Sequence, residues 1–447
     1  MRIFKAKTFQ RICSLVILIA FLVVGIVVMG EALTPISYAT YFNHDIKTIE
    51  ENNQGVGLVF VGASRVFHSY VPEIFEQELG TNCVVNAGSS AQPICGTYYQ
   101  LKDLVERLHP ENVVIGVTWD GIVGDAKPNQ QSMLIVYDRL SVSNKIEFSF
   151  TNFKTKNLLY CLRPYRYKDN MSWEILKDNY EEKQKLIYNS YVADRNQDQD
   201  QYYSDKGFVY FTHSCKTGNV DIRETGIFST ELVAEDKLDY LDACVKLCQE
   251  HDIPVYLVSG MSTMMRLYSI ENYQEAVDFY TMYAEEHGII YHNLNYLLDR
   301  EEIFPDEMMR DYNHLNGEGA YRVSKIYAEI LRKDMQGIDT SDYFYEDLDD
   351  LKKDVHRIVA VKGDITMDET DIGLAHVVIT SLQNEDITPQ YQLEISKNDG
   401  ENYEAVVEWT EESEWDISVP TGQEYMIKVR AKTGNEGDAE AYQIYTF

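Results

Sequence analysis

The sequence predicts an α/β fold: a three-layer αβα domain around a parallel sheet, of flavodoxin-like type, with a transmembrane helix before it and a β-sandwich after it. Three observations predict this arrangement. An apolar run lies within the first thirty residues, β-branched runs alternate with helical segments up to about residue 333, and short alternating segments follow residue 354. With 447 residues, 45% of them hydrophobic, the chain can bury more than one core, and we expect divisions at 1–33, 34–345 and 346–447.

The apolar run, Ile12 to Met29, is nearly long enough as a helix to cross a hydrocarbon layer of about 30 Å. Four basic residues precede it and acidic residues dominate after it, so the positive-inside rule places the N-terminus in the cytoplasm. We therefore expect a single-pass anchor in the cell membrane with the remaining chain outside the cytoplasm. The alternative is a cleaved signal peptide with Gly30-Glu31-Ala32 as its small-residue site, which would make the protein secreted.

The α/β part follows a polar stretch, residues 34–54, that has no clear periodicity and that we interpret as a lead-in to the fold. The expected strands are Gly57–Val61, Cys83–Asn86, Val113–Val117, Pro254–Val258 and Ile289–His292, and the expected helices are Val71–Leu79, Tyr98–Leu108, Glu231–Glu250, Ile270–Glu286 and Gly317–Leu331. Residues of about 124–227 interrupt this alternation. They predict an inserted subdomain or lid, because structureless loops of that length are rare.

The C-terminal part begins after the acidic stretch Thr340 to Asp354. Alternating runs at about ten-residue spacing predict a β-sandwich there, with strands at Ala375–Ile379, Tyr391–Ile395, Tyr403–Trp409 and Tyr425–Arg430. In length and strand rhythm it resembles a fibronectin type III module. No pattern in it indicates chemistry, so we expect a spacer or adhesion module.

The net charge of −32 argues against nucleic acid and anionic lipid head groups as partners, because Lys and Arg bind those groups. Seven cysteines without repeating spacing do not indicate a disulfide scaffold. Cys244 and Cys248 lie one helical turn apart, but no partner Cys or His has the spacing of a zinc site, so we interpret them as core residues. No metal or organic cofactor is expected.

The first candidate site is Gly62-Ala63-Ser64-Arg65, directly after the apolar run Leu58 to Val61. Ligands of open α/β sheets bind at the carboxyl ends of the strands, so Ser64 is placed where a nucleophile would lie. A serine after a glycine is also common as a helix N-cap or turn residue, and this alternative stays open for the motif alone.

The second candidate is Asp311-Tyr312-Asn313-His314, close before the last helix of the α/β part. An imidazole accepts a serine proton efficiently when a carboxylate fixes its tautomer and stabilises the imidazolium. Asp311, three residues before His314, lets both side chains project from one loop. Asp-x-x-His can arise by chance in a chain this acidic, but its position before the helix makes it more specific.

The third candidate is the loop Asn86-Ala87-Gly88, again at the end of an expected strand. A glycine-containing loop there can offer a backbone N–H to an oxyanion, which is where acyl transfer receives its largest electrostatic stabilisation. Three strand-end sites in this order favour catalysis over isolated turn residues.

Together these three blocks resemble the first, second and fifth sequence blocks of the SGNH (GDSL-like) hydrolases, and the similarity spans roughly residues 56 to 333. The chain particularly resembles the membrane-anchored branch that includes the D-alanyl transfer protein of teichoic acid modification and the alginate O-acetylation proteins. The resemblance implies that Ser64 is the nucleophile, His314 the base and Asp311 its orienting acid. It also implies that the N–H groups of Ser64 and Gly88 contribute to an oxyanion hole.

One block departs from that family, which places an oxyanion-hole Asn after the third strand where this chain has Asp120. An ionised carboxylate cannot donate a hydrogen bond and would repel an oxyanion. Either Asp120 is protonated, or another donor such as Thr118 replaces it, or activity is reduced. Weak hydrolysis would still suit a transferase, which must keep water from its acyl-enzyme.

Residues beside these blocks are candidates for substrate contact, namely Arg65, Asn86 and Trp119. The Arg65 guanidinium can bind a carboxylate or phosphate, although a structural ion pair is an equal alternative. We expect His68 to be a surface residue of the following helix. The aromatic segment Tyr165-Arg166-Tyr167 could form a glycan-binding wall, but core packing is the simpler interpretation.

The function that these residues predict is acyl transfer or ester hydrolysis through a Ser64 acyl-enzyme, acting on O-acyl groups of a cell-surface polysaccharide. By the resemblance, a multi-pass membrane O-acyltransferase is a possible partner. The rival hypothesis is an inactive protein of the same fold that binds glycan or serves assembly, with Asp120 as a sign of decay. A purely adhesive protein built around the β-sandwich is the third hypothesis.

Overall fold

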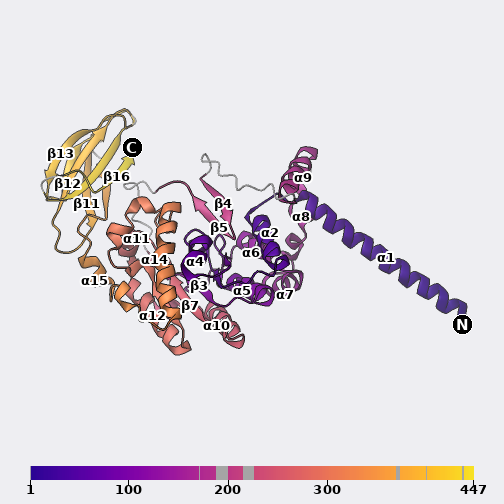
Figure 1. The fold of residues 1–447 in the computed structure, drawn as a ribbon. Coiled ribbons are helices and arrows are strands. Elements are labelled where there is room, and N and C mark those ends of the chain that lie inside the picture. Colours follow the sequence, from indigo (N-terminus) through magenta and orange to yellow (C-terminus); the bar gives the residue numbers. More distant parts are fainter. Residues whose placement is uncertain are drawn as a thin grey trace.

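The computed structural model describes residues 2–170, 172–187, 200–214, 226–368, 373–398, 400–434 and 437–447. A long N-terminal helix, α1 (Arg2–Leu33), leaves one end of an α/β body, and an antiparallel β domain lies at the opposite end (Figure 1). The body between them carries Ser64, Asp311 and His314.

A parallel sheet of five strands forms the centre of this body. Its strands, in spatial order, are β2 (Val84–Asn86), β1 (Leu58–Val61), β3 (Val113–Val117), β7 (Val255–Ser259) and β9 (Ile290–Asn293). Numbered among themselves, these strands have the order 2-1-3-4-5, which is that of flavodoxin-like doubly wound folds. The prediction of an α/β fold with a parallel sheet is confirmed, and the carboxyl ends of all five strands lie at one edge.

Helices cover both faces of the sheet. One face packs against α2 (Tyr38–Glu51), α5 (Ile94–Leu108) and α10 (Glu235–Glu250), and the other against α4 (Pro72–Leu79) and α14 (Gly317–Met335). Alternate residues of each strand divide between the faces, as the pleat requires: Val59 and Val61 face the first group of helices, and Leu58 and Phe60 face the second.

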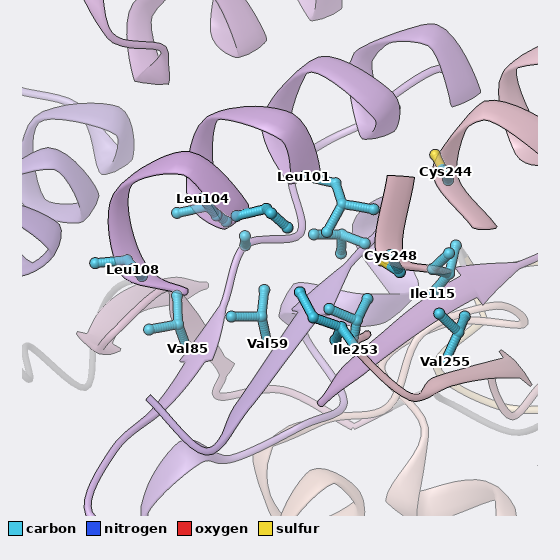
Figure 2. Close-up of a cluster of buried hydrophobic side chains, with 14 of the residues drawn as sticks. Val59, Val85, Leu101, Leu104, Leu108, Ile115, Cys244, Cys248, Ile253 and Val255 are labelled. Carbon is cyan, nitrogen blue, oxygen red and sulfur yellow. The ribbon is translucent and has the colours of Figure 1, made fainter. Parts of the chain in front are cut away.

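The core on the first face is shown in Figure 2, where leucines of α5 lie over Val59 and Val85. Cys244 and Cys248 of α10 project into the same core, and both are free and fully buried. Their interpretation as core residues is confirmed.

Helix α2 occupies the stretch 34–54, where the sequence pattern indicated no element. Its buried residues include Phe42, Ile46 and Ile49, spaced as one face of a helix, but polar neighbours mask the stripe. The helix expected at Ile270–Glu286 begins later than predicted. Ile270 and Glu271 form the short strand β8 (Ile270–Glu271), and α12 (Tyr273–His287) begins after Asn272, which adopts φ +60°; a separate helix, α11 (Met264–Ser269), precedes the strand.

Helices and a hairpin fill much of the connection between β3 and β7. They are α6 (Gln130–Arg139), α7 (Val142–Asn152), α8 (Arg163–Arg166), α9 (Trp173–Ile187), β4 (Gln201–Asp205) and β5 (Phe208–Phe211). The hairpin of β4 and β5 reaches the end of β2, where the N–H of Asn86 donates to the carbonyl of Lys206 at 2.8 Å. This connection therefore contributes directly to the edge of the sheet that carries the candidate site.

Helices α8 and α9 also pack against the C-terminal end of α1 (Figure 1). Arg163 forms an ion pair with Glu31, and the Asn179 amide donates to the carbonyls of Ala32 and Leu33, each at 3.3 Å. Only residues 34–37 separate α1 from α2. The body is thus held against the end of α1 by side chains as well as by the chain itself.

Among the described residues, one helix is long and apolar enough to cross a membrane, over Arg11–Leu33. An anchor and a signal sequence both fit this length and composition, so the expected topology and location outside the cytoplasm stay predictions.

The C-terminal domain contains two antiparallel sheets around one apolar core. Their strands in spatial order are β10 (Ala360–Met367), β11 (Leu374–Leu382) and β14 (Glu414–Ser418), and β13 (Glu404–Thr410), β12 (Pro389–Ser396), β15 (Met426–Thr433) and β16 (Ala441–Thr446). The four strands expected from sequence correspond to β11, β12, β13 and β15. Identity with a fibronectin type III module stays a prediction.

Candidate active site

Ser64 lies just beyond the end of β1, at the carboxyl edge of the sheet. Gly62 precedes it with φ +149°, and a side chain at that position would come within 2.6 Å of Val66 and 3.0 Å of the Gly116 carbonyl oxygen. The strand can therefore turn sharply only because residue 62 is glycine. Ser64 begins α3 (Ser64–Phe67), which directs its side chain away from the strand.

The imidazole of His314 meets Ser64 although 250 residues separate them, with a distance of 2.8 Å between His314 Nε2 and Ser64 Oγ. His314 Nδ1 lies 2.9 Å from each carboxylate oxygen of Asp311. A carboxylate only accepts hydrogen bonds, so Nδ1 carries the proton and Nε2 is left to accept the hydroxyl proton of Ser64.

The Asp311 carboxylate is held in its ionised form by the loop around it. Burial opposes this ionisation, but the hydrogen bond and charge of His314 and the N–H groups of Asn313 and His314 lower the pKa of Asp311 below its ordinary value. Those N–H groups donate to Asp311 Oδ1 at 2.8 and 3.0 Å. The loop itself therefore fixes the carboxylate that orients the imidazole.

Arg65 joins the nucleophile turn to the histidine loop, because its Nη2 donates to Asn313 Oδ1 at 2.5 Å. Burial lowers the pKa of Arg65, while the negative charge of Asp120 raises it. Arg65 forms no ion pair within the described part of the chain, which differs from the salt-bridge alternative. Asn313 was not among the residues predicted for the site, although it stands between Asp311 and His314 in the motif.

Of the two backbone N–H groups expected in an oxyanion hole, those of Ser64 and Gly88, only that of Ser64 is unengaged among the described residues. Its N–H opens the first turn of α3 and has no hydrogen-bond acceptor among the described residues. The N–H of Gly88 instead donates to Asn86 Oδ1 at 3.2 Å. Asp120 is exposed to solvent and acts electrostatically on Arg65.

Two residues expected to contact substrate are placed in the interior instead. The Asn86 side chain is fully buried, and its Nδ2 donates to the carbonyls of Val66 and Tyr70 at 2.9 and 2.8 Å. Asn86 therefore links β2 to the helix that carries Ser64. Trp119 is 9% exposed and packs against Phe228 and Met264 in a core cluster.

The expectation that His68 is a surface residue was wrong, because its side chain is buried and only 3% exposed. The β4–β5 hairpin covers it: the Phe211 ring stacks on the imidazole with centroids 3.6 Å apart, and the Val209 carbonyl lies 2.8 Å from His68 Nδ1. A carbonyl only accepts, so Nδ1 carries the proton. Phe211 also lies against His314, with centroids 6.1 Å apart, so the hairpin supports the base of the site.

The burial of His68 predicts a loss of stability in mild acid. Burial lowers the pKa of His68 to about 3, so the folded protein resists a proton that the unfolded chain binds near pH 6.5. This stabilisation is complete above pH 6.5 and is lost as the pH falls toward 3. Between pH 7 and pH 5 the free energy of unfolding should fall by about 2 kcal/mol on this account. Urea unfolding at both pH values measures it.

The matched variants are His68→Asn, whose amide can still donate to the Val209 carbonyl, and His356→Asn at an exposed position. The first should lose the extra acid sensitivity and the second should retain it. Equal pH dependence in wild type and His68→Asn would contradict the prediction.

Tyr165, Arg166 and Tyr167 lie on and after α8, beside the end of α1. Arg166 Nη1 pairs with Asp138 Oδ2 at 2.6 Å, and both tyrosines are partly buried. None of the three contacts Ser64, Asp311 or His314 in the hydrogen bonds and ring contacts of the site. Within the described ranges, no group of three or more His, Cys, Asp or Glu side chains is arranged to hold a metal ion.

No family model and no curated protein matches this sequence. Similar solved structures include a GDSL-like lipase from Bacteroides thetaiotaomicron VPI-5482, which is 12% identical with a TM-score of 0.30 over 66% of this chain and 99% of that one. A putative lipolytic protein of the G-D-S-L family from Desulfitobacterium hafniense DCB-2 is 11% identical with a TM-score of 0.29, over 61% and 98%. A putative acylhydrolase from Bacteroides fragilis NCTC 9343 is 10% identical with a TM-score of 0.30, over 65% and 97%. The chain is thus similar to GDSL-like lipases and acylhydrolases at low identity and low TM-score, so the case for its chemistry rests on the geometry of Ser64, His314 and Asp311.

Proposed function

We propose that this protein is an ester-acting serine hydrolase or acyltransferase that works through an acyl-enzyme on Ser64. The observation that carries the proposal is the 2.8 Å contact between Ser64 Oγ and His314 Nε2, with Asp311 on the other ring nitrogen. A serine, a histidine with one free nitrogen and a carboxylate in this sequence of contacts are the parts that nucleophilic acyl transfer requires.

The reaction follows from these contacts. His314 Nε2 takes the hydroxyl proton as Ser64 Oγ attacks the ester carbonyl, and the Ser64 N–H stabilises the oxyanion. The protonated imidazole, stabilised by Asp311, then gives its proton to the departing alcohol oxygen. An acceptor hydroxyl or water loses a proton to the same nitrogen and attacks the acyl-enzyme carbonyl. The bond from the acyl carbon to Ser64 Oγ then breaks, and the imidazolium returns the proton to Oγ, which restores Ser64.

The absence of an asparagine at position 120 predicts slow chemistry at Ser64 within this proposal, and slow hydrolysis is compatible with a transferase. The Ser64 N–H without an asparagine amide beside it stabilises an oxyanion less than two or three donors, each of which contributes on the order of 10²-fold in rate. Asp120 would oppose negative charge on substrate oxygen, while Arg65 beside it offsets part of that effect. We therefore expect slow turnover toward water.

For the substrate, we propose O-acyl groups of a cell-surface polysaccharide, with a multi-pass membrane O-acyltransferase as the partner that supplies the acyl group. The support is the sequence resemblance to the D-alanyl transfer and alginate O-acetylation proteins, together with one apolar helix that suits a membrane anchor. In that setting, α1 would keep the catalytic serine near an acyl donor in the membrane.

Labelling of the full chain with a fluorophosphonate probe tests the proposal. The wild type should label, because an activated serine attacks phosphorus as it attacks an acyl carbon, and Ser64→Ala should not label. Ser90→Ala is the matched control, since Ser90 is an exposed serine of the neighbouring loop and should leave labelling unchanged. Wild-type protein that unfolds cooperatively but stays unlabelled would favour the rival, a binding or assembly protein of the same fold.

A further inference from the structure

A cavity of about 370 Å³ lies between the candidate active site and the end of α1. Phe67, Ser89 and Ser90 form its wall on the active-site side. Phe67 is on the same short helix as Ser64, and the Ser89 N–H donates to the Gly62 carbonyl at 3.1 Å. The cavity thus reaches the loops that hold the nucleophile.

A second cavity of about 240 Å³ continues this space toward α1. Ser37, Ala39 and Asp138 line both cavities, and Glu31 and Thr34 line the second one. Glu31 belongs to the last turns of α1, the helix suited to a membrane. The two cavities therefore lie next to each other between the end of that helix and the loop at Ser89.

The first cavity contains a buried cation that has no counter-ion. The Arg139 side chain is 2% exposed, and it forms no ion pair with any described residue. Its Nη1 donates to the carbonyls of Ala87 and Gly88, at 3.3 and 2.7 Å, while its Nε has no hydrogen-bond partner. A buried guanidinium without a carboxylate is costly unless a ligand supplies the negative charge.

A second guanidinium in the same cavity also has an unused donor. Arg166 Nη1 pairs with Asp138, but the buried Nη2 has no hydrogen-bond partner. Arg139 and Arg166 thus both line this cavity, and each has one buried N–H group without an acceptor. Guanidinium groups bind phosphate and carboxylate oxygens well. Asp138 balances one of the two arginines, so the lining keeps one positive charge in excess, that of Arg139.

The charge around the cavity is opposite to that of the whole chain. Residues 139–168 contain seven Lys and Arg and one acidic residue, a net charge of +6 within a protein of −32. The net charge of the whole chain therefore does not describe this segment, where basic residues concentrate next to α1.

The same segment also contains a helix with an apolar face that is exposed to solvent. Val142, Ile146 and Phe150 stand four residues apart on α7, so they share one face of the helix, and each is more than half exposed. Figure 1 shows α8 and α9 at the place where α1 leaves the body, and α7 farther along the same end of the body. An apolar helix face flanked by lysines and arginines is typical of helices that lie at a lipid surface.

We propose that the cavity lined by Arg139 and Arg166 binds the phosphate head group of an anionic phospholipid of the membrane that holds α1. The apolar walls at Phe67, Leu134 and Ile135 suit the start of an acyl chain, and the two arginines suit the phosphate. A volume of about 370 Å³ is within the range of small-molecule sites and admits a head group but not a whole lipid. This site goes beyond ester chemistry at Ser64 and does not depend on it.

Native mass spectrometry of the full chain, released from neutral detergent micelles, tests the proposal with phosphatidylglycerol as the probe. We expect wild type to retain one phosphatidylglycerol and to retain phosphatidylcholine of the same acyl chains at least tenfold less. Arg166→Gln and Arg139→Gln should each weaken retention at least tenfold. Arg322→Gln, at an exposed arginine of α14, should retain the lipid as wild type does.

Arg139→Gln can also disturb the loop at Gly88, because Arg139 donates to the Gly88 carbonyl. We therefore add a third variant that changes no charged residue. Ala39→Phe fills the junction of the two cavities and should abolish retention, with the thermal midpoint measured to establish that the protein is folded. Unchanged retention in all three variants would overturn the proposal, as would equal retention of phosphatidylcholine. If 10 mM inorganic phosphate displaced phosphatidylglycerol completely, the site would be one for a free anion and the lipid source would be wrong.

Discussion

Replacing Asp311 with asparagine is expected to lower the kcat of ester hydrolysis on the order of 10⁴-fold, with the fold intact. The amide oxygen can still accept the N–H groups of Asn313 and His314, so the loop keeps its shape. The amide group no longer fixes the proton on His314 Nδ1 or stabilises the imidazolium. Steady-state hydrolysis of p-nitrophenyl acetate by wild type and variant measures the effect.

Asp200→Asn is the matched control, because Asp200 pairs with Arg310 at 2.5 Å and makes no hydrogen bond to Asp311 or His314 among the described residues. That variant removes a neighbouring carboxylate and should keep at least a third of the wild-type kcat. A loss in Asp311→Asn below about tenfold would mean that the carboxylate does not orient the base, and that Ser64 is not activated in the proposed way.

Replacing Gly207 with alanine is expected to lower the free energy of unfolding by about 4 kcal/mol. Gly207 adopts φ +97° in the turn of the β4–β5 hairpin, and a β-carbon there would lie 1.6 Å from the Asn86 carbonyl oxygen. Either the hairpin or the end of β2 must move. Chemical unfolding measures the stability, and fluorophosphonate labelling of the folded variant reports whether the displaced hairpin also slows Ser64.

Gly80→Ala separates backbone strain from collision. Gly80 has φ +67° at the end of α4, and nothing lies within 4 Å of the position of its β-carbon. That variant should cost about 1 kcal/mol from the left-handed conformation alone. Equal costs at the two glycines would show that the hairpin yields freely and that its contact with β2 does not position the site.

The triad residues were predictable from sequence because each lies in a local pattern at the end of a strand or before a helix. Ser64 follows an apolar run and a glycine, and Asp311 and His314 share one short loop. The order of strands in a doubly wound sheet brings such loops to one edge. The three residues of the site could therefore be predicted from short sequence motifs and from the topology that doubly wound sheets share.

His68 and Asn86 were misplaced for the opposite reason, since their surroundings come from distant parts of the chain. The hairpin that buries His68 lies about 140 positions away, with Val209 as the hydrogen-bond partner. Asn86 looks like an exposed loop residue, but its amide is consumed by two carbonyls of the preceding helical turn and by Gly88. The residues next to His68 and Asn86 in the sequence therefore do not indicate that these side chains are buried.

Strand β10 shows how packing can hide a strand from its own sequence. Gly363 interrupts its alternation, and it is required because a β-carbon would come within 2.8 Å of Val429 in the opposite sheet. Glycine is disfavoured in strands, so the pattern weakens at a position where the two sheets are in contact.

The four-residue passage between α1 and α2, braced by Arg163 and Asn179, bears on which molecules the protein can reach. A protein on a long flexible stalk would sweep a wide radius above its membrane. With α1 as the membrane anchor of the proposal, Ser64 would instead lie at a fixed height above the bilayer, so a polymer substrate of the proposed kind would have to be presented close to the membrane. Insertion of a flexible spacer after Thr34 would widen that radius and break the bracing contacts at the same time.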